Sequence, residues 1–257
     1  MTRNTPSRLI LAIETSAPRY GAALAESEAG GSVTILAEEH LEAGARRGEN
    51  LTTSIERVLS AAGRHVEDLS ALAAVTGPGS YTGLRAGLAL IRGLALVDRL
   101  PVVPVGSLEL VARAAPRGAE AAKRICALLD ASGGKVYAAG YVRSDGAAGD
   151  EIFDEQYAPT LTSAVELARL LERWGGSWVV YGDRELRDLV GLDREVTEKR
   201  AGVLARIGAE RLARGAVAAA ERVLPLYVGA SVARPNRNRV APVEALSRGP
   251  GGGAVST

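Results

Sequence analysis

The chain is poor in the residue types that build disulfides and metal sites. Its single cysteine, Cys126, excludes a disulfide within the chain. Its two histidines, His40 and His65, are too far apart for a close-spaced metal motif, and no cysteine pair is present to complete a zinc site. We therefore expect no metal ion, and the cysteine usage is typical of a reducing cytoplasm.

The chain also lacks an excess of one charge and a long apolar run. Its 31 Lys and Arg residues nearly balance its 30 Asp and Glu residues, so no overall field attracts nucleic acid or an anionic membrane. The first apolar run ends where Glu14 follows Ile13, too early for a signal sequence or a membrane span. We expect a cytoplasmic protein with no membrane contact.

The chain does have enough apolar material for a sizeable core. With 257 residues, 47% of them hydrophobic, it fits one large or two small domains. Short apolar runs alternate with segments of helical period in the first part of the chain. They predict strands at 8–16, 20–27, 32–40, 72–77 and 100–107, with helices at 49–62 and 81–97. This order is typical of an α/β lobe with a mixed sheet.

A second cycle of strands and helices begins near residue 123. It predicts two strands joined through "DASGGK", then a strand from 151, a helix from 161, a strand from 177 and a helix at 199–215. Both halves open with a strand hairpin near an acidic residue, Glu14 or Asp130, which suggests a duplicated architecture. We predict a first lobe with the association helices at 1–107, a second lobe at 108–228 whose last helix can return to the first, and a flexible tail at 229–257.

The stretch "VTGPGSYTGLRAGLALIRGLAL", residues 75–96, raises the question of a phosphate-binding loop. It does not match the Walker motif, because no lysine lies between 1 and 122. It does not match G-x-G-x-x-G either, because Thr82 stands where the third glycine is required. A tight structural turn, with Ser80 able to cap the helix that follows, is favoured over a nucleotide site.

The helix after this turn carries several small residues. Glycine inside a helix costs up to about 1 kcal/mol relative to alanine, so Gly83, Gly87 and Gly93 call for a reason such as close backbone contact. Two interpretations remain open. The helix packs on its own sheet, or it presents a second face, carrying Arg85 and Arg92, to another protein.

The same stretch resembles the TsaB family, also called YeaZ, together with "ILAIETS" upstream and "LLDASGGKVYAAGY" downstream. The resemblance covers residues 8 to about 228. It implies an α/β fold of two duplicated lobes, similar to the sugar kinase, Hsp70 and actin (ASKHA) superfamily. It also implies a non-catalytic subunit of the bacterial machinery that makes threonylcarbamoyladenosine at adenosine 37 of tRNA.

The resemblance further implies partners and sites. The expected partners are the catalytic subunit TsaD, the ATPase TsaE through the complex, a second copy when alone, and tRNA indirectly. The implied interface comprises Leu51, Ile55, Val58, Leu59, Thr82, Gly83, Leu84, Arg85, Gly87, Leu88, Ile91 and Arg92. A degenerate nucleotide site is implied at Glu14, Gly77, Gly79, Ser80, Asp130 and Gly133. No cofactor is expected beyond weak ATP or ADP binding at the complex interface.

Several positions depart from catalytic relatives. The H-x-x-x-H motif of TsaD is missing, Glu14 replaces the aspartate of nucleotide-hydrolysing members, and no nucleophile elbow is recognisable. Ser132 and Lys135 in "DASGGK" stand where many family members carry an arginine and an acidic residue, and Gly229 stands where arginine is usual. We therefore expect no enzymatic activity from the isolated chain. The alternatives are a residual nucleotide-binding enzyme and a homodimeric, M22-like glycoprotease.

Overall fold

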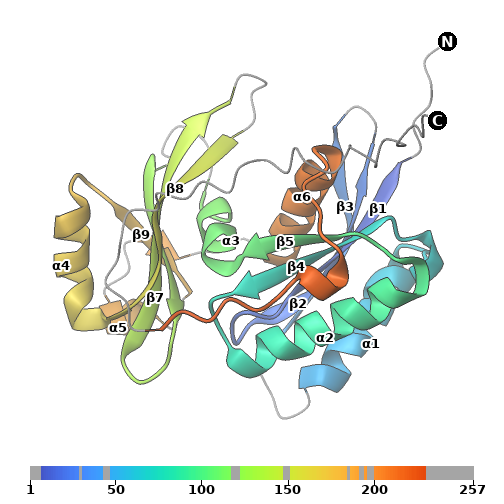
Figure 1. Ribbon diagram of the computed structural model, residues 1–257, viewed down its shortest axis with the longest axis horizontal. Helices are drawn as coiled ribbons and strands as arrows, with labels where there is room; N and C mark the ends of the chain where they lie inside the picture. The colour runs from blue at the N-terminus through green and yellow to red at the C-terminus, as the bar shows by residue number, and fades with distance from the viewer. Residues whose placement is uncertain are drawn as a thin grey trace, which may run out of the picture.

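Two five-stranded β-sheets, lying side by side, organise the chain into two lobes (Figure 1). The computed structural model describes residues 7–28, 31–42, 47–116, 122–146, 151–183, 186–190, 194–195 and 200–229. The predicted tail at 229–257 lies outside these residues except for Gly229. The strand order is β3-β2-β1-β4-β5 in the first sheet and β10-β9-β6-β7-β8 in the second. When the second sheet is followed from β8 to β10, both sheets have the same order: the third, second, first, fourth and fifth strand of their half of the chain. The duplicated architecture is therefore confirmed.

The first lobe follows the predicted order of elements. Its strands are β1 (Arg8–Glu14), β2 (Tyr20–Ser27), β3 (Val33–Leu41), β4 (Ala71–Gly77) and β5 (Val102–Gly106), and its helices are α1 (Arg47–Ala61), the short 3₁₀ helix η1 (Val66–Asp68) and α2 (Tyr81–Asp98). β1, β2 and β3 are antiparallel neighbours, whereas β4 runs parallel to β1 and β5. The mixed sheet is therefore confirmed.

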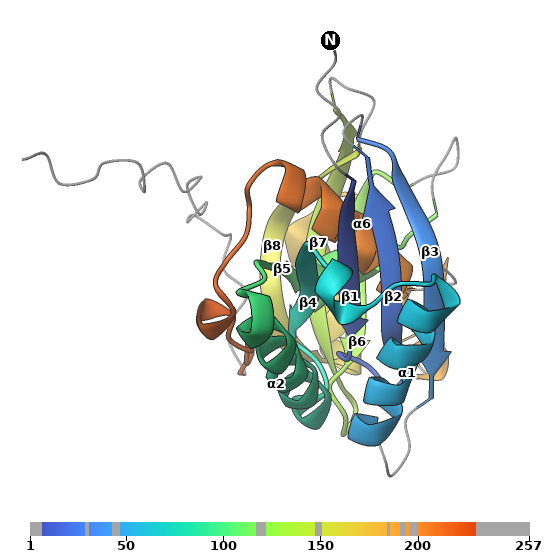
Figure 2. The ribbon, with the colours of Figure 1, turned by 90° about the vertical axis from the view of Figure 1, so that its right-hand side faces the viewer.

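Both faces of the first sheet are covered. Leu11 and Ile13 of β1 pack on one face with residues of α1 and α2, which lie side by side in Figure 2. Ile10 and Ala12 pack on the other face against the late helix α6 (Arg200–Ala213). Because both faces are buried, β1 has an almost uninterrupted apolar sequence in place of an alternating one.

The second lobe repeats this plan with shorter helices. Its elements are α3 (Ser107–Arg113), β6 (Arg124–Asp130), β7 (Lys135–Asp145), β8 (Glu151–Ser163), α4 (Ala164–Trp174), β9 (Val179–Gly182), α5 (Arg187–Val190) and β10 (Arg194–Glu195). α3, which the sequence analysis did not predict, follows β5 directly. Its Leu108, Val111 and Ala112 pack with β6 and β7 in one apolar cluster. α4 covers the outer face, with Leu167, Leu170 and Trp174 buried.

The chain returns to the first lobe after β10. α6 packs on a face of the first sheet that is rich in alanine, and a Cβ at Gly208 would lie 2.8 Å from the Cβ of Ala73. The following segment bridges to β5 through Val102 and Ala218 and forms the 3₁₀ helix η3 (Ala220–Arg222). We call residues 223–229 the C-terminal segment. It continues past α2 towards the second lobe (Figure 1).

Candidate interaction surface and inter-lobe cleft

The glycines between β4 and α2 are packed against two other backbone segments. Gly77 has a φ of 111°, and a Cβ there would lie 2.7 Å from the carbonyl oxygen of Leu226. At Gly79, where φ is 154°, a Cβ would overlap the carbonyl oxygen of Ser16. That oxygen accepts a hydrogen bond from the backbone N–H of Ser80 at 2.7 Å. The close approach of these two backbone carbonyls is therefore what requires glycine at positions 77 and 79.

Glu14 is enclosed by the chain's own polar groups. It is 2% exposed and accepts hydrogen bonds from the Ser16 backbone N–H at 2.7 Å and the Ser16 hydroxyl at 2.6 Å. Its second carboxylate oxygen lies 3.6 Å from the Arg200 guanidinium, which reaches Asp183 of the second lobe at 3.3 Å. This buried network joins the two lobes. Glu14 serves that network and does not line the cleft described next.

The cleft between the lobes is lined mainly by hydroxyl groups. Its volume is about 360 Å³, and it is lined by Ser16, Pro18, Gly79, Ser80, Tyr81, Thr82, Asp130, Ala131, Ser132 and Tyr137. Of the implied nucleotide residues, Gly79, Ser80 and Asp130 meet here. Gly77 instead faces Leu226, and Gly133 lies in the turn between β6 and β7. Asp130 is the one charged side chain among these lining residues, and a polyphosphate in the cleft would meet its negative charge.

α2 uses its small residues to pack inside the first lobe. Ser80 caps the helix, as predicted, by accepting a hydrogen bond from the Gly83 N–H at 3.2 Å. A Cβ at Gly87 would overlap the Thr15 hydroxyl, so this glycine permits close contact with the turn after β1. The inward face of the helix consists of Leu84, Leu88, Ile91 and Ala95, all of which are buried.

The burial of α1 corrects part of the predicted interface. Leu51, Ile55, Val58 and Leu59 are each no more than 5% exposed, and they belong to the core between α1 and the first sheet. The helical spacing was right, but an amphipathic helix turns its apolar stripe towards its own sheet. Nine predicted interface residues are buried within the lobe: Leu51, Ile55, Val58, Leu59, Gly83, Leu84, Gly87, Leu88 and Ile91. Thr82, Arg85 and Arg92 reach the surface.

The opposite side of α2 forms an outward row. It consists of Thr82, Arg85, Ala89, Arg92 and Leu96, spaced by three or four residues along the helix. Gly93 lies beside this row, and a Cβ there would meet nothing within 4 Å. Nothing in the described part of the chain therefore requires glycine at 93, although glycine weakens the helix. A smooth outward face on α2 points to a contact from outside the lobe.

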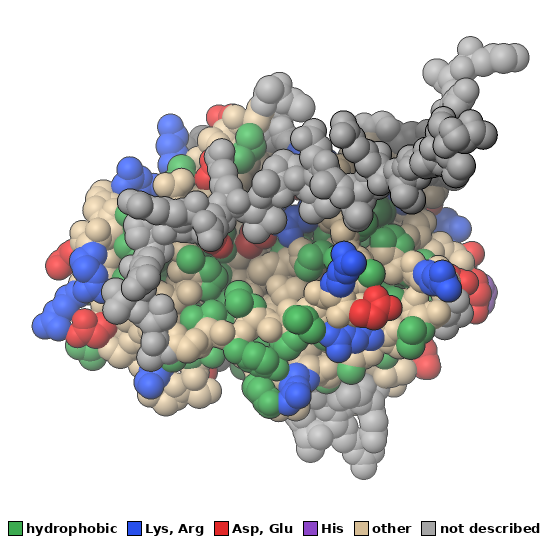
Figure 3. Space-filling model, in the orientation of Figure 1, with side chains coloured by type: hydrophobic (Ala, Val, Ile, Leu, Met, Phe, Trp, Pro, Cys, Tyr) green, Lys and Arg blue, Asp and Glu red, His purple; other side chains and the backbone are tan. Residues whose placement is uncertain are grey.

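Exposed apolar side chains concentrate next to this row. Of the nine large exposed hydrophobic residues in the described part of the chain, six lie on α2 or in the stretch after α6: Tyr81, Leu96, Val217, Leu224, Leu226 and Tyr227. The Tyr81 and Tyr227 rings lie 5.4 Å apart, and Leu226 N–H donates to the Thr76 carbonyl. Figure 3 shows hydrophobic side chains gathered in the lower middle of this face. Concentration of this kind marks an interaction site.

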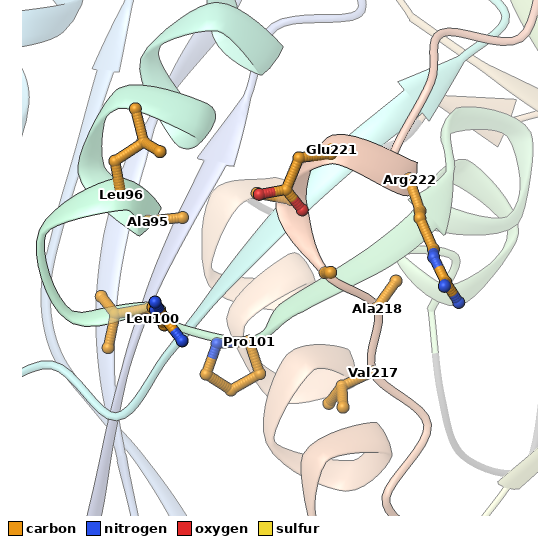
Figure 4. Close-up of a pocket in the computed structure, with 11 residues that line it drawn as sticks. Ala95, Leu96, Leu100, Pro101, Val217, Ala218, Glu221 and Arg222 are labelled. Carbon is orange, nitrogen blue, oxygen red and sulfur yellow. The ribbon is translucent and has the colours of Figure 1, made fainter. Parts of the chain in front are cut away.

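A groove lies at the C-terminal end of α2 (Figure 4). It has a volume of about 990 Å³ between α2 and residues 217–222. Leu100, Pro101, Val217 and Ala218 contribute apolar surface to it, and Leu96 lies on its α2 side. Together with the outward row and the C-terminal segment, the groove makes up what we call the α2 surface.

The contribution of the C-terminal segment was not predicted. The sequence analysis noted only that Gly229 stands where arginine is usual in the family, and it did not predict the contacts of this segment with the turn before α2. The sequence signal for this contact was Gly77. A glycine at the end of a strand often marks a place where another backbone segment approaches closely, and here that segment contains Leu226.

The described residues offer neither a cluster of metal ligands nor a membrane-spanning helix. They include no group of three or more His, Cys, Asp or Glu side chains arranged to hold a metal ion. None of the helices within the described ranges is long and apolar enough to cross a membrane. The site is therefore defined by the α2 surface and the inter-lobe cleft.

Two duplicated lobes facing each other across a cleft define an ASKHA-like fold, and comparison with solved structures agrees. The structure titled "YeaZ from Pseudomonas aeruginosa" matches with a TM-score of 0.64 and 22% identity, covering 86% of this chain and all of that one. The chain thus belongs to the ASKHA-like α/β fold class.

Comparison with curated proteins shows similarity to proteins of tRNA threonylcarbamoyladenosine biosynthesis. The tRNA threonylcarbamoyladenosine biosynthesis protein TsaB of Escherichia coli is 28% identical over 87% of this chain and 96% of its own length. The tRNA N6-adenosine threonylcarbamoyltransferase of Maricaulis maris is 34% identical over 39% of this chain and 30% of its own. A family model described as TsaD, tRNA N6-adenosine threonylcarbamoyltransferase, matches residues 41–166. These matches support the resemblance of this chain to the TsaB (YeaZ) family of tRNA threonylcarbamoyladenosine biosynthesis proteins.

Proposed function

We propose that this chain is the non-catalytic subunit that binds and activates the threonylcarbamoyltransferase TsaD during modification of adenosine 37 in tRNA. The observation that carries the proposal is the α2 surface. It combines exposed tyrosine, leucine and arginine side chains, and tyrosine and arginine are enriched where protein interfaces gain most of their binding energy.

The likeness between this chain and TsaD supports the pairing. The TsaD family model covers residues 41–166, which include both α1 and α2. Two related lobes can associate through equivalent surfaces about an approximate two-fold axis, as identical subunits do about an exact one. The α2 surface would then face the corresponding helices of TsaD. In the absence of TsaD, a second copy of this chain would use the same surface.

The inter-lobe cleft supports the non-catalytic part of the proposal. Glu14 accepts hydrogen bonds from Ser16 and lies within 3.6 Å of Arg200, so it is not positioned to hold a catalytic cation. Asp130 accepts a hydrogen bond from the Ser132 backbone N–H at 2.8 Å. Of the hydroxyls that line the cleft, that of Ser16 donates to the Glu14 carboxylate at 2.6 Å, and this carboxylate is already engaged by the Ser16 backbone N–H and by Arg200. These observations do not favour the nucleotide-dependent enzyme or the glycoprotease.

The remaining parts of the proposal concern the assembled complex. Weak ATP or ADP binding would occur at the complex interface, and TsaE would join through the complex. The tRNA would be contacted indirectly, because the 31 basic and 30 acidic residues of this chain produce no strong overall field. The complex would work in the cytoplasm.

Reconstitution with TsaD of the same organism tests the proposal. Purified TsaD and TsaE are assayed for threonylcarbamoyl transfer to tRNA with and without this chain, and co-purification with TsaD is measured in parallel. We expect this chain to be inactive alone, to co-purify with TsaD and to raise the transfer rate. Full transfer without this chain, or transfer by this chain alone, would contradict the proposal.

A matched pair of exposed residues tests the α2 surface itself. Leu96 is 73% exposed on α2, and Val165 is 81% exposed on α4 of the second lobe. Burying a leucine at an interface contributes about 2 kcal/mol, and an unpaired aspartate there adds a desolvation cost. We expect Leu96→Asp to weaken TsaD binding by about thirtyfold or more and Val165→Asp to leave it unchanged. Equal effects of the two substitutions would exclude the α2 surface as the contact.

A further inference from the structure

The outward row of α2 carries two arginines, Arg85 and Arg92, that form no ion pair with a carboxylate in the described part of the chain. The Arg85 guanidinium lies 4.9 Å from the centre of the Tyr81 ring and donates to the Tyr81 hydroxyl. Arg92 donates to the carbonyl oxygen of Val223 at 2.8 Å, and its Nε has no acceptor within the described part of the chain. The printed contacts of both arginines are therefore with neutral groups, and Glu221, which lines the adjoining groove, is the acidic side chain that the groove contributes to the α2 surface.

Other arginines in the described ranges do pair with carboxylates. Arg57 pairs with Glu39 at 2.8 Å, and Arg211 binds both carboxylate oxygens of Glu109 at 2.7 and 2.8 Å. The outward row itself contains no acidic residue. Asp98 ends the helix beyond it, and Glu56 is exposed on α1.

The spacing of the two arginines sets a geometric requirement on a partner. Arg85 and Arg92 are seven residues apart, which is two helical turns or about 10 Å along the axis. Ala89 lies between them, so a helix can approach closely there. At the C-terminal end of the row, Leu96 and the groove offer apolar surface to the same helix.

We propose that the outward row selects a different protein over a second copy of this chain, and that the selected helix carries carboxylates about two turns apart. The proposal rests on the function proposed above and specifies the chemistry of the partner. In a symmetric pair of identical chains the same patch faces itself, so the two arginine rows would meet and repel. A partner with acidic side chains in those positions would convert the repulsion into attraction.

Salt dependence separates the two kinds of association. Sedimentation velocity is measured at about 50 mM and 500 mM NaCl, between which the screening length falls from about 14 Å to about 4 Å, across the spacing of about 10 Å between the two arginines. We expect the complex with TsaD to weaken by about tenfold at high salt. Self-association of this chain should strengthen, because repulsion is screened. Weakening of both associations, or of neither, would overturn the proposal.

Charge reversal gives a second test. We expect Arg85→Glu to weaken the TsaD complex by about fivefold to tenfold, and the addition of Arg92→Glu to weaken it further. Arg173→Glu, an exposed change on α4, is the matched control. Circular dichroism melts check that each variant folds. If Arg92→Glu loosens the C-terminal segment by removing the hydrogen bond to Val223, the single variant Arg85→Glu decides the test. If the reversed variants bind TsaD as the wild type does, this inference fails while the proposed function stands.

Mixing two copies tests repulsion without TsaD. An equimolar mixture of wild type and the doubly reversed variant brings arginines opposite glutamates. We expect mixed dimers to form at concentrations at which either protein alone is monomeric. If the mixture associates no more than the separate proteins, charge is not what opposes self-association. If the wild type never binds TsaD at any salt concentration, the proposed function itself fails.

Discussion

Two glycines in α2 should respond in opposite ways to the same substitution. Gly87 faces Thr15 inside the lobe, and a Cβ there would overlap the Thr15 hydroxyl. Gly93 lies six residues further along the helix, with open space at its Cβ position. Leucine is a better helix former than glycine by about 0.8 kcal/mol at either site. The gain in helix propensity is therefore the same at both sites, and any difference in stability comes from the atoms around each new side chain.

The expected magnitudes follow from those surroundings. Overpacking a filled site costs about 1–3 kcal/mol and sometimes more. With four added carbon atoms against Thr15, we expect Gly87→Leu to lower the free energy of unfolding by about 2 kcal/mol or more after the helix gain. For a chain of this size that corresponds to a melting temperature lower by about 4–8 °C. Gly93→Leu should instead raise the melting temperature by about 2–3 °C.

Association should show the reverse pattern. A leucine at 93 would hold a partner helix away from the α2 surface, so we expect Gly93→Leu to weaken TsaD binding by at least tenfold. Far-UV circular dichroism measures folding, because Trp174 and Trp178 both lie in the second lobe and their fluorescence would not report on α2 directly. The reasoning is refuted if Gly87→Leu melts like the wild type but loses TsaD, or if Gly93→Leu binds TsaD normally.

Two further predictions concern buried polar groups. Arg200→Met leaves Glu14 without the guanidinium that lies 3.6 Å away, so the free energy of unfolding should fall by about 3–5 kcal/mol in urea titrations, and Glu14→Gln in the same chain should recover part of it. Burial, followed by the negative charge of Glu155, raises the pKa of Tyr141 well above its ordinary value of 10.0. Because the folded chain holds this proton more tightly than the unfolded chain, the stability gained is complete below pH 10 and is lost as the pH rises towards the folded pKa. Tyr141→Phe should flatten the stability curve above pH 10, and an unchanged curve would show that another group titrates there.

Local sequence patterns predicted most of the strands and helices and their succession along the chain. Apolar runs bounded by turn residues gave β1, β2, β4 and β6, and helical spacing gave α1 and α6. α3 was missed because only seven residues separate the end of β5 from the end of that helix, too few for a periodic pattern to be distinctive. Ser80 was recognised as a cap because that interaction is local.

The candidate site was harder to predict because it depends on contacts between distant segments. Leu51 and Ile55 have the spacing of an apolar stripe, but spacing does not tell if the stripe faces the chain's own sheet or a partner. The glycines before α2 predicted a tight structural turn, but not its neighbours, Ser16 and Leu226, which lie far away in the sequence. No local rule assigns such neighbours.

The return of the chain to its first lobe has a consequence for synthesis on the ribosome. α6 covers one face of the first sheet, and Leu226 fills the space at Gly77, although both lie near the end of the described chain. The first sheet is therefore still uncovered on that face when its own strands have emerged, and the second lobe is made before it can be completed. Aggregation during translation should be most acute in this interval, and a ribosome stalled before α6 should carry a nascent first lobe that proteases cleave readily.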